Sequence, residues 1–393
     1  MPDSTKHARA NLEGLPRAGE TFDGKYRIEG LLGAGGMGVV FAATHLRLGQ
    51  RVAIKMLLPE WVGDEAVAQR FAREGRASVA VRSEHIVRVL DVDEAQGRPY
   101  LVLEYLEGED LEEIIATRGA LPIPTAVDLI LQACEALAEV HASGVIHRDL
   151  KPANLFLTYR ADGSPCLKVL DFGISKATAR NSGFIEEGTQ PLTVMGSPHY
   201  MSPEQMQSAT DVDVRADLWS IGAILHELLA GKPPFEGESI TALCAHVMTD
   251  PPPPLTRLRR DVPPALEGVV LRCLEKDRRR RYADVGELAH ALASFGSDAA
   301  RASAARIARV LEGGPGGSVR PPASLPREGL SPSPPTARNL VSDVSFPAGI
   351  HRPFGGYLLA AAFVGALVGG TAWKLHAQAA ALHDAEQRAQ GQT

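Results

Sequence analysis

The sequence predicts an α+β fold with two lobes: a small five-stranded antiparallel β lobe carrying one helix, then a larger, mainly helical lobe. Apolar residues alternate with a period of two in runs between Tyr26 and Leu103, as they do in half-buried strands. From Thr125 to Ala142 they recur at the 3.6-residue period of an amphipathic helix. A length of 393 residues with 45% hydrophobic residues allows a sizeable core.

Composition narrows the class of protein. The formal net charge of −6 does not indicate a nucleic-acid-binding surface. The four cysteines are far apart and form no CxxC pair, which argues against a zinc site or a disulfide framework. Residues 1–23 are polar and small. They predict a flexible N-terminal arm and not a secretory signal.

A glycine-rich loop follows the first strand. Residues 33–40 read GAGGMGVV, a GxGxxGxV pattern whose glycines let the backbone approach a polyphosphate. A dinucleotide-binding turn would have a helix directly after the glycines. Residues 39–43 are instead β-branched, aromatic or small and predict a second strand. The loop is therefore expected between two antiparallel strands.

The remaining elements follow in order. A third strand, 51–55, ends in Lys55, and residues 64–81 are expected to form a helix. Strands are predicted at 86–92 and 100–103, and a polar link with a glycine follows at 104–108. The helix 125–142 begins at two prolines and ends at Gly144. Residues 213–230 are apolar on most sides, which predicts a buried helix.

The sequence HRDLKPAN at 147–154, followed by DFG at 171–173, places a possible base, a cation and two possible metal ligands close together. SPE follows at 202–204. With GxGxxGxV and VAIK before them, these motifs resemble the signatures of protein kinases. Over about residues 24–295 the chain resembles the bacterial, eukaryotic-like (Hanks-type) serine/threonine protein kinases. The resemblance implies the two-lobed kinase fold, transfer of the ATP γ-phosphate to protein serine or threonine, and ATP with Mg2+ or Mn2+ as cofactors.

The resemblance assigns catalytic roles by position. Asp149 would orient and deprotonate the substrate hydroxyl, and Lys151 would steady the γ-phosphate. Asn154 and Asp171 would hold the metal ions.

Lys55 would bond the α- and β-phosphates and needs a carboxylate to hold it. Glu74, on the predicted helix 64–81, is the best candidate for this partner. Glu65 and Glu84 are rivals by position alone.

The expected ATP-binding residues come from the glycine loop, the strands around it, the link between lobes and the lobe below. Leu103 would be the gatekeeper, and backbone groups of Glu104 and Leu106 would bond the adenine. Phe156 would form the floor of the pocket. The full set is Leu32, Gly33, Ala34, Gly35, Gly36, Met37, Gly38, Val40, Ala53, Lys55, Leu103, Glu104, Leu106 and Phe156.

An activation segment is expected between residues 171 and 204. Arg148 would bind a phosphorylated residue in it, and Thr189 or Thr193 is expected to be autophosphorylated. Ser197 would contact the catalytic loop. Glu204 would form a buried ion pair with Arg281, one of four consecutive arginines.

The C-terminal quarter has a different composition. Residues 297–353 are rich in proline, glycine, serine and alanine, which predicts a linker without a packed core. Residues 354–373 carry no charge and are expected to cross a membrane once, and 374–393 form a short tail. Gly365 and Gly369 have a spacing compatible with a homodimer, although it is common by chance in such segments.

The predicted domains are therefore an arm at 1–23, a kinase domain at 24–296 with lobes 24–105 and 106–296, a linker, a span and a tail. The resemblance and the span together predict an inner-membrane protein, single-pass, with its kinase domain in the cytoplasm. An alternative function is a nucleotide-binding pseudokinase that acts as a scaffold at the membrane.

Overall fold

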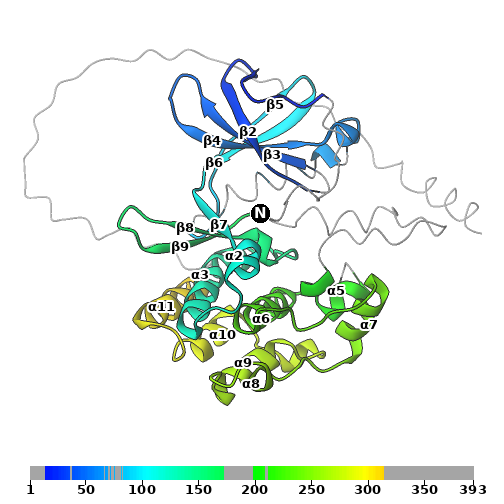
Figure 1. The fold of residues 1–393 in the computed structure, drawn as a ribbon, viewed down its shortest axis with the longest axis vertical. Coiled ribbons are helices and arrows are strands. Elements are labelled where there is room, and N and C mark those ends of the chain that lie inside the picture. Colours follow the sequence, from blue (N-terminus) through cyan, green and yellow to red (C-terminus); the bar gives the residue numbers. More distant parts are fainter. Residues whose placement is uncertain are drawn as a thin grey trace, which may run out of the picture. The chain divides into compact units, whose positions relative to one another are not determined.

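The computed structural model describes residues 14–35, 38–65, 67–69, 71, 75, 81, 83–171, 198–208 and 211–313. The chain divides into two compact units, Met1–Pro321 and Pro322–Thr393. Every described residue belongs to the first unit, which combines a β-sheet lobe with a helical lobe (Figure 1). The predicted α+β architecture is confirmed.

The first lobe is built on one antiparallel sheet with the strand order β1-β2-β3-β4-β6-β5. Its strands are β1 (Thr21–Phe22), β2 (Tyr26–Ala34), β3 (Gly38–His45), β4 (Arg51–Leu57), β5 (Val89–Ala95) and β6 (Arg98–Glu104). Alternate residues of β2 and β4 are buried, including Ile28, Val52 and Ile54, because one face of the pleat covers the core. The sheet therefore has six strands where the sequence predicted five.

The additional strand also shortens the predicted flexible arm. Thr21 and Phe22 pair with Arg27 and Tyr26 of β2. Leu15 is only 8% exposed in the core of this lobe. Residues 14–23 are thus anchored to the sheet, and residues 1–13 lie outside the described part of the chain.

A helix on the sheet begins after the short turn η2 (Pro59–Trp61). Its described residues include Val67 and Phe71, which are buried against the sheet, and Gly75. A Cβ added at Gly75 would lie 2.5 Å from Leu101 of β6. Gly75 costs the helix about 1 kcal/mol relative to alanine, but a Cβ here would require the Leu101 side chain to move.

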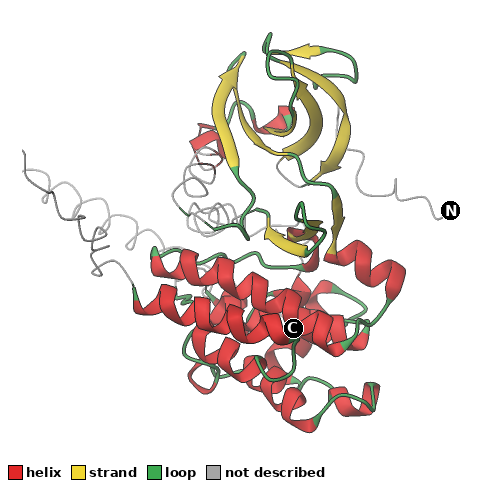
Figure 2. Cartoon of the chain, turned by 90° about the vertical axis from the view of Figure 1, so that its left-hand side faces the viewer, coloured by secondary structure: helices red, strands yellow, loops and turns green. Residues whose placement is uncertain are grey.

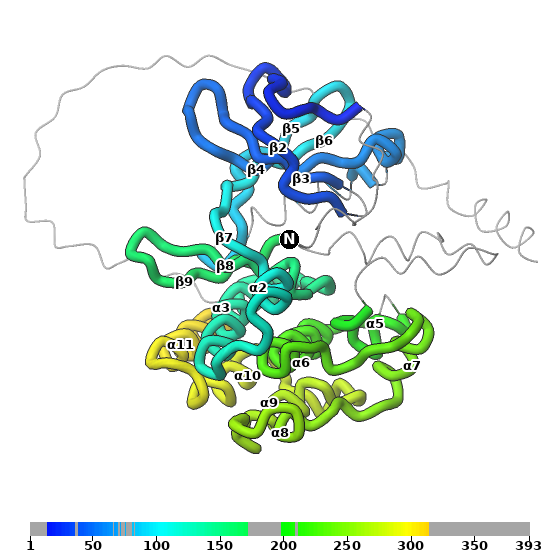
Figure 3. The backbone as a smooth tube through the Cα atoms, in the orientation of Figure 1, coloured from blue at the N-terminus to red at the C-terminus, as the bar shows by residue number. Residues whose placement is uncertain are grey.

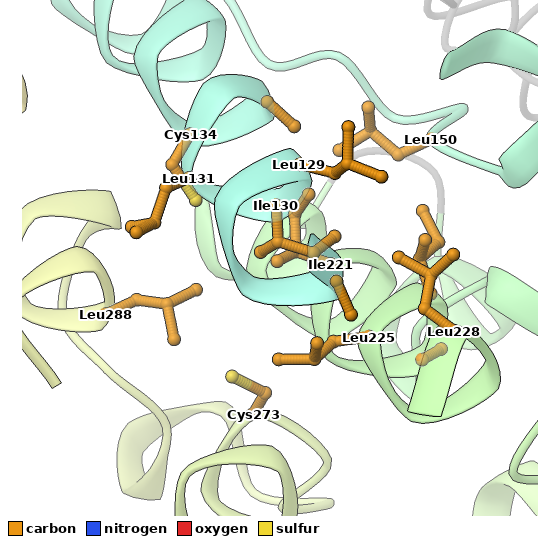
Figure 4. Close-up of a cluster of buried hydrophobic side chains, with 14 of the residues drawn as sticks. Leu129, Ile130, Leu131, Cys134, Leu150, Ile221, Leu225, Leu228, Cys273 and Leu288 are labelled. Atoms are coloured by element: carbon orange, nitrogen blue, oxygen red, sulfur yellow. The ribbon is translucent and has the colours of Figure 1, made fainter. Parts of the chain in front are cut away.

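The second lobe contains α2 (Leu111–Arg118), α3 (Ile123–Ala142), α5 (Pro203–Gln207), α6 (Arg215–Ala230), α7 (Ile240–Thr249), α8 (Leu255–Leu258), α9 (Pro264–Cys273), α10 (Val285–Leu292) and α11 (Asp298–Glu312). Figure 2 shows these helices below the strands of the first lobe. The centre of the core lies where α3 and α6 cross, with Ile130 and Ile221 facing each other (Figure 4). Both long helices lie within about two residues of their predicted bounds.

A three-stranded sheet lies at the top of the helical lobe. The chain leaves the first lobe at β6, forms β7 (Gly108–Asp110) and enters α2 (Figure 3). β7 pairs with β8 (Leu155–Tyr159), which pairs with β9 (Pro165–Val169). The short turn η3 (Pro152–Asn154) leads into β8, and β9 ends two residues before Asp171.

The predicted linker begins too early. Residues 298–312 form α11, whose cap is Ser297 and whose Ile307 is fully buried. Arg306 of this helix makes two hydrogen bonds, of 2.6 and 2.7 Å, to the carboxylate of Glu135 on α3. The folded domain therefore continues to about residue 312, beyond the predicted boundary at 296.

The rest of the linker, the predicted span 354–373 and the tail 374–393 lie outside the described residues. In the described part of the chain, no helix is both long enough and apolar enough to cross a bilayer.

Candidate active site

The catalytic loop, residues 147–154, lies between α3 and β8 in the chain, and one buried carboxylate binds its backbone. Asp217 of α6 is completely buried. Its Oδ2 accepts a hydrogen bond from the backbone N–H of His147 at 2.9 Å, and its Oδ1 accepts one from Arg148 N–H at 2.8 Å. His141 Nε2, at the end of α3, lies 2.8 Å from the same carboxylate. Asp217 therefore binds two adjacent backbone amides of the loop.

Arg148 occupies a left-handed backbone conformation, with φ of +66°. A non-glycine residue in this region is strained by about 1–3 kcal/mol. The surrounding structure fixes it from both sides, because Asp217 accepts its N–H and Gln205 Nε2 donates to its carbonyl at 2.9 Å. Gln205 was not predicted as a site residue, and its signal was only its place beside SPE.

The hydrogen bonds around Asp217 favour the charged form of its carboxyl group. Burial works to raise the pKa of its carboxyl, but the hydrogen bond and charge of His141, together with the backbone donors, hold that pKa below its usual range. His141 was not predicted as a site residue. Its signal in the sequence was a polar side chain among the apolar residues of the helix 125–142.

Asp149 and Asn154 are tied together inside the loop. Asn154 Nδ2 donates to the carbonyl of Asp149 at 2.8 Å and to its Oδ2 at 3.3 Å. The carbonyl of Asn154 accepts the N–H of Leu170 at 2.9 Å. This bond brings the segment with Asp171 alongside the loop. Lys151, three residues before Asn154, is half-buried at the start of η3.

Lys55 of β4 reaches across the lobes to Asp171, with Nζ 2.7 Å from Oδ1. Desolvation works to raise the pKa of the Asp171 carboxyl, but the charge and hydrogen bond of Lys55, with the charge of Lys151, hold it below its usual range. Glu74, the predicted partner of Lys55, lies outside the described residues. Neither rival carboxylate takes its place: Glu84 pairs with Arg160, and Glu65 accepts from Gln69.

The glycine loop has the strand-loop-strand form that the sequence predicted. β2 and β3 are antiparallel, and Gly35 N–H donates to the carbonyl of Gly38 at 2.8 Å. A Cβ on Gly38 would lie 2.7 Å from the carbonyl oxygen of Met56, so only glycine fits there. A Cβ added at Gly33 would have no neighbouring atom within 4 Å, and Leu32 is 51% exposed. Gly36 and Met37 lie outside the described residues.

Four of the predicted adenine-site residues share one apolar cluster between the lobes. Val40, Ala53, Leu103 and Leu106 pack in it with Leu101 and Val87, among others. Phe156 lies below, on β8 opposite Asp110 of β7. The N–H of Glu104 donates to the carbonyl of Arg88 at 3.0 Å. Any adenine bond at Glu104 must therefore use its carbonyl.

At the end of the activation segment, Arg281 and Glu204 form a bidentate ion pair, with N–O distances of 2.6 and 2.8 Å. The Arg281 side chain is completely buried, and its Nη1 and Nε also donate to the carbonyls of Arg215 and Glu275. Thr189, Thr193 and Ser197 lie outside the described residues.

The residues present fit ATP and a hard metal ion. Both hydrogen bonds of the Asn154 side chain use its nitrogen, so its Oδ1 can face a cation. Asp171 keeps Oδ2 for the same purpose, because Lys55 contacts Oδ1. No group of three or more His, Cys, Asp or Glu side chains in the described part of the chain could hold a metal. An ion here would depend on these two oxygens with phosphate and water.

Comparison with known proteins gives a consistent answer. The model of the protein kinase domain matches residues 26–293. The chain is 39% identical over 313 residues to the serine/threonine-protein kinase Pkn1 of Myxococcus xanthus, covering 78% of this chain and 43% of that protein. It is 39% identical over 269 residues to PknB of Mycolicibacterium smegmatis, covering 67% and 42%. The chain thus spans less than half the length of these relatives.

The solved structures agree. The kinase domain of PknI from Mycobacterium tuberculosis has a TM-score of 0.54 and 28% identity to this chain. The match covers 72% of this chain and all of that domain. The family model over most of the chain, the two relatives named as serine/threonine kinases and the shared fold all agree. The chain belongs to the protein kinase family, and its folded domain is a serine/threonine protein kinase domain of the bacterial Hanks type.

Proposed function

We propose that the whole chain transfers the γ-phosphoryl group of ATP to serine and threonine hydroxyls of proteins in bacterial signal transduction. The observation that carries the proposal is the joining of Lys55, Asp149, Asn154 and Asp171 in one hydrogen-bonded site between the lobes. Bound ATP supplies the phosphoryl group, and Mg2+ or Mn2+ supplies positive charge on its oxygens.

The residues of the chain divide the work. Asp149 accepts the proton of the attacking hydroxyl as the new oxygen–phosphorus bond forms and the bond to the β-phosphate oxygen breaks. Lys55 and Lys151 offset negative charge on the phosphates, and Asn154 and Asp171 offer oxygens to the metal. Positioning and charge stabilisation provide most of the rate in such transfers.

Transfer of labelled γ-phosphate to the chain itself and to a generic protein substrate tests this function. Asp149→Asn keeps the shape of the side chain but not its basicity. We expect it to lower transfer on the order of 1,000-fold, while nucleotide still binds. Asp91→Asn, at an exposed position on β5, is the matched control and should retain full activity. Equal transfer by wild type and Asp149→Asn would contradict the assignment.

The alternative, a pseudokinase scaffold, predicts a different result in the same assay. Wild-type chain would then bind nucleotide with either metal and transfer nothing to itself or to any substrate. The presence of Lys55, Asp149, Asn154 and Asp171 favours the enzyme.

Autophosphorylation of the activation segment is part of the proposal. Arg148 lies half-buried beside the end of that segment, where a guanidinium can bind a phosphate. Mass spectrometry of active protein should find phosphate on Thr189 or Thr193. Full activity in a double alanine variant of both threonines would show that neither controls the enzyme.

We also propose that residues 354–373 anchor the chain in the inner membrane, with the kinase domain on the cytoplasmic side. Support comes from the uncharged composition of this segment. The full chain should remain with membranes after an alkaline wash, and a chain ending at residue 353 should not. The substitution Gly365→Leu tests the homodimer, because it should abolish cross-linking between two copies if that face mediates contact.

A further inference from the structure

A cavity of about 370 Å3 lies outside the active site, between α3, α11 and the turn at residues 83–85. Its size is within the usual range for small-molecule sites. Its polar lining includes Glu84, His85, Glu135 and Glu139, with Arg306 and Arg309. None of these residues belongs to the nucleotide site described above. Figure 1 shows α11 lying along α3 below the β8–β9 hairpin.

His85 lines this cavity and has an unsatisfied acceptor. Its side chain is 1% exposed, and Nδ1 lies 2.8 Å from the carbonyl oxygen of Leu167. Because that oxygen can only accept, Nδ1 carries the proton and Nε2 is the acceptor. Nε2 is buried without a hydrogen-bond partner in the described part of the chain. Burial lowers the pKa of His85, which favours this neutral ring.

The nearest carboxylates do not satisfy His85. Glu84 and Glu135 approach Nε2 only to 3.7 and 3.9 Å, and each is engaged by an arginine. Glu139 has no side-chain hydrogen bond or ion pair to any residue that the structure describes. Burial raises the pKa of its carboxyl, as expected for a carboxylate without a compensating cation. The cavity therefore offers two acceptors, Nε2 of His85 and the carboxylate of Glu139, and no described residue donates a hydrogen bond to either.

We propose that this cavity binds a small organic cation, of the primary-ammonium or guanidinium class, whose N–H groups donate to His85 Nε2 and to Glu139. A neutral apolar molecule would leave both acceptors unsatisfied. An anion has no N–H group to donate to His85 Nε2 or to Glu139, and Arg306 is already committed to Glu135. The acceptors do not form a metal site, because the described residues contain no suitable group of three ligands.

The cavity adjoins a turn that is hydrogen-bonded to β9, the strand that precedes Asp171. The carbonyl of His85 accepts the N–H of Val169 at 2.8 Å, and Val87 N–H donates to the carbonyl of Val169 at 3.0 Å. Val169 is the last residue of β9, two before Asp171. The other wall is α11, which follows the residues that match the kinase family model. A cation bound to His85 and Glu139 would link α3 to the turn that pairs with the end of β9, two residues before Asp171.

Titration calorimetry with 1,4-diaminobutane tests the proposal on the full chain in neutral detergent. We expect saturable binding, and none with 1,4-butanediol, which has the same length without the charges. The titration is repeated with Asp149→Asn, so that binding is measured where phosphoryl transfer is blocked. Equal binding by both chains supports a site that is independent of the proposed enzymatic function.

Three substitutions locate the ligand. Glu139→Gln and His85→Asn should each weaken binding about tenfold; the asparagine amide can keep the bond to Leu167. Arg309→Gln removes a competing cation from the cavity wall and should strengthen binding about threefold. Glu60→Gln, at an exposed position in the other lobe, is the matched control and should change nothing.

The opposite directions keep the test decisive if one variant folds poorly, because loss of structure cannot strengthen binding. Absence of saturable binding by wild-type chain overturns the proposal. So does equal affinity of wild type, Glu139→Gln and Arg309→Gln, because the ligand would then bind elsewhere.

Discussion

Two ion pairs flank the catalytic loop, and their surroundings differ. Arg281 and Glu204, in the helical lobe, are 0% and 12% exposed and are joined by two hydrogen bonds. Lys55 and Asp171, between the lobes, are 13% and 47% exposed and are joined by one. Backbone carbonyls surround the first pair, whereas the Asp171 side of the second is open to solvent.

The difference indicates two uses of charge. A buried pair that is fully hydrogen-bonded is costly to break, so Arg281 and Glu204 act as a permanent part of the scaffold, as Asp217 does. A pair open to water exchanges partners at little cost. Lys55 and Asp171 can therefore turn from each other to phosphate and metal. Substitutions in the two pairs should therefore differ in their effect on the free energy of unfolding.

The largest effect is expected for Asp217→Ala. The change removes the acceptor of three hydrogen bonds in a fully buried position, which should lower the free energy of unfolding by about 4–5 kcal/mol. Phosphoryl transfer should fall on the order of 100-fold, because the loop loses its support. Urea unfolding and kcat measure the two effects. Asp91→Ala is the exposed control; if both variants unfold alike, Asp217 is not the anchor.

Arg281→Met should be next, with a loss of about 3 kcal/mol, because Glu204 is left as a nearly buried charge without its cation. The double variant Arg281→Met/Glu204→Met should recover part of this loss, since the uncompensated charge is then absent. Urea denaturation of both variants measures the difference. A double variant less stable than the single one would contradict the explanation.

A third test uses Lys276, beside Arg281. Its Nζ donates to the carbonyl of Val247 at 2.6 Å and lies 4.1 Å from the centre of the Phe235 ring. Burial lowers the pKa of Lys276 from 10.5 to about 8. Between these pH values the unfolded chain holds a proton that the folded chain has released. The contribution of Lys276 to stability therefore rises with pH in this window and is lost as pH falls through about 8.

After an allowance for its partly exposed surface, this rise should be about 1–2 kcal/mol. Urea unfolding of wild type and Lys276→Met at several pH values from 7 to 10.5 measures it. The difference between the two proteins isolates Lys276 from the tyrosines and cysteines that titrate in the same range. A constant difference across the window would show that burial does not perturb this amine.

The sequence predicted elements with strong periodicity and missed those without it. β1 is two residues long and shows no period, and its place depends on pairing with β2. α11 carries an apolar stripe through Ala300 and Ile307, but its alanine and arginine content resembled the linker that follows. The prediction of a linker from residue 297 followed the composition of this segment and missed its apolar periodicity.

The site also has residues that the sequence predicted and features that only the tertiary structure shows. Motifs predicted Lys55, Asp149, Asn154 and Asp171 as parts of one site, and the structure brings these four residues together. The conformation of Arg148 could not be read from the sequence, since it depends on Asp217 and Gln205 far along the chain. Nor could the cavity beside His85, which needs α3, α11 and a turn to come together.

The smallest effect on stability is expected for Lys55→Met, which breaks the more exposed of the two ion pairs. Asp171 remains half-exposed without its partner, so the free energy of unfolding should change by less than about 1 kcal/mol. Transfer of γ-phosphate should nevertheless fall on the order of 100-fold or more, because the phosphates lose a preorganised cation. Urea unfolding and kcat/KM for ATP separate the two. A loss of stability as large as that of Arg281→Met would show that Lys55 is part of the scaffold, and the distinction between the two ion pairs would fail.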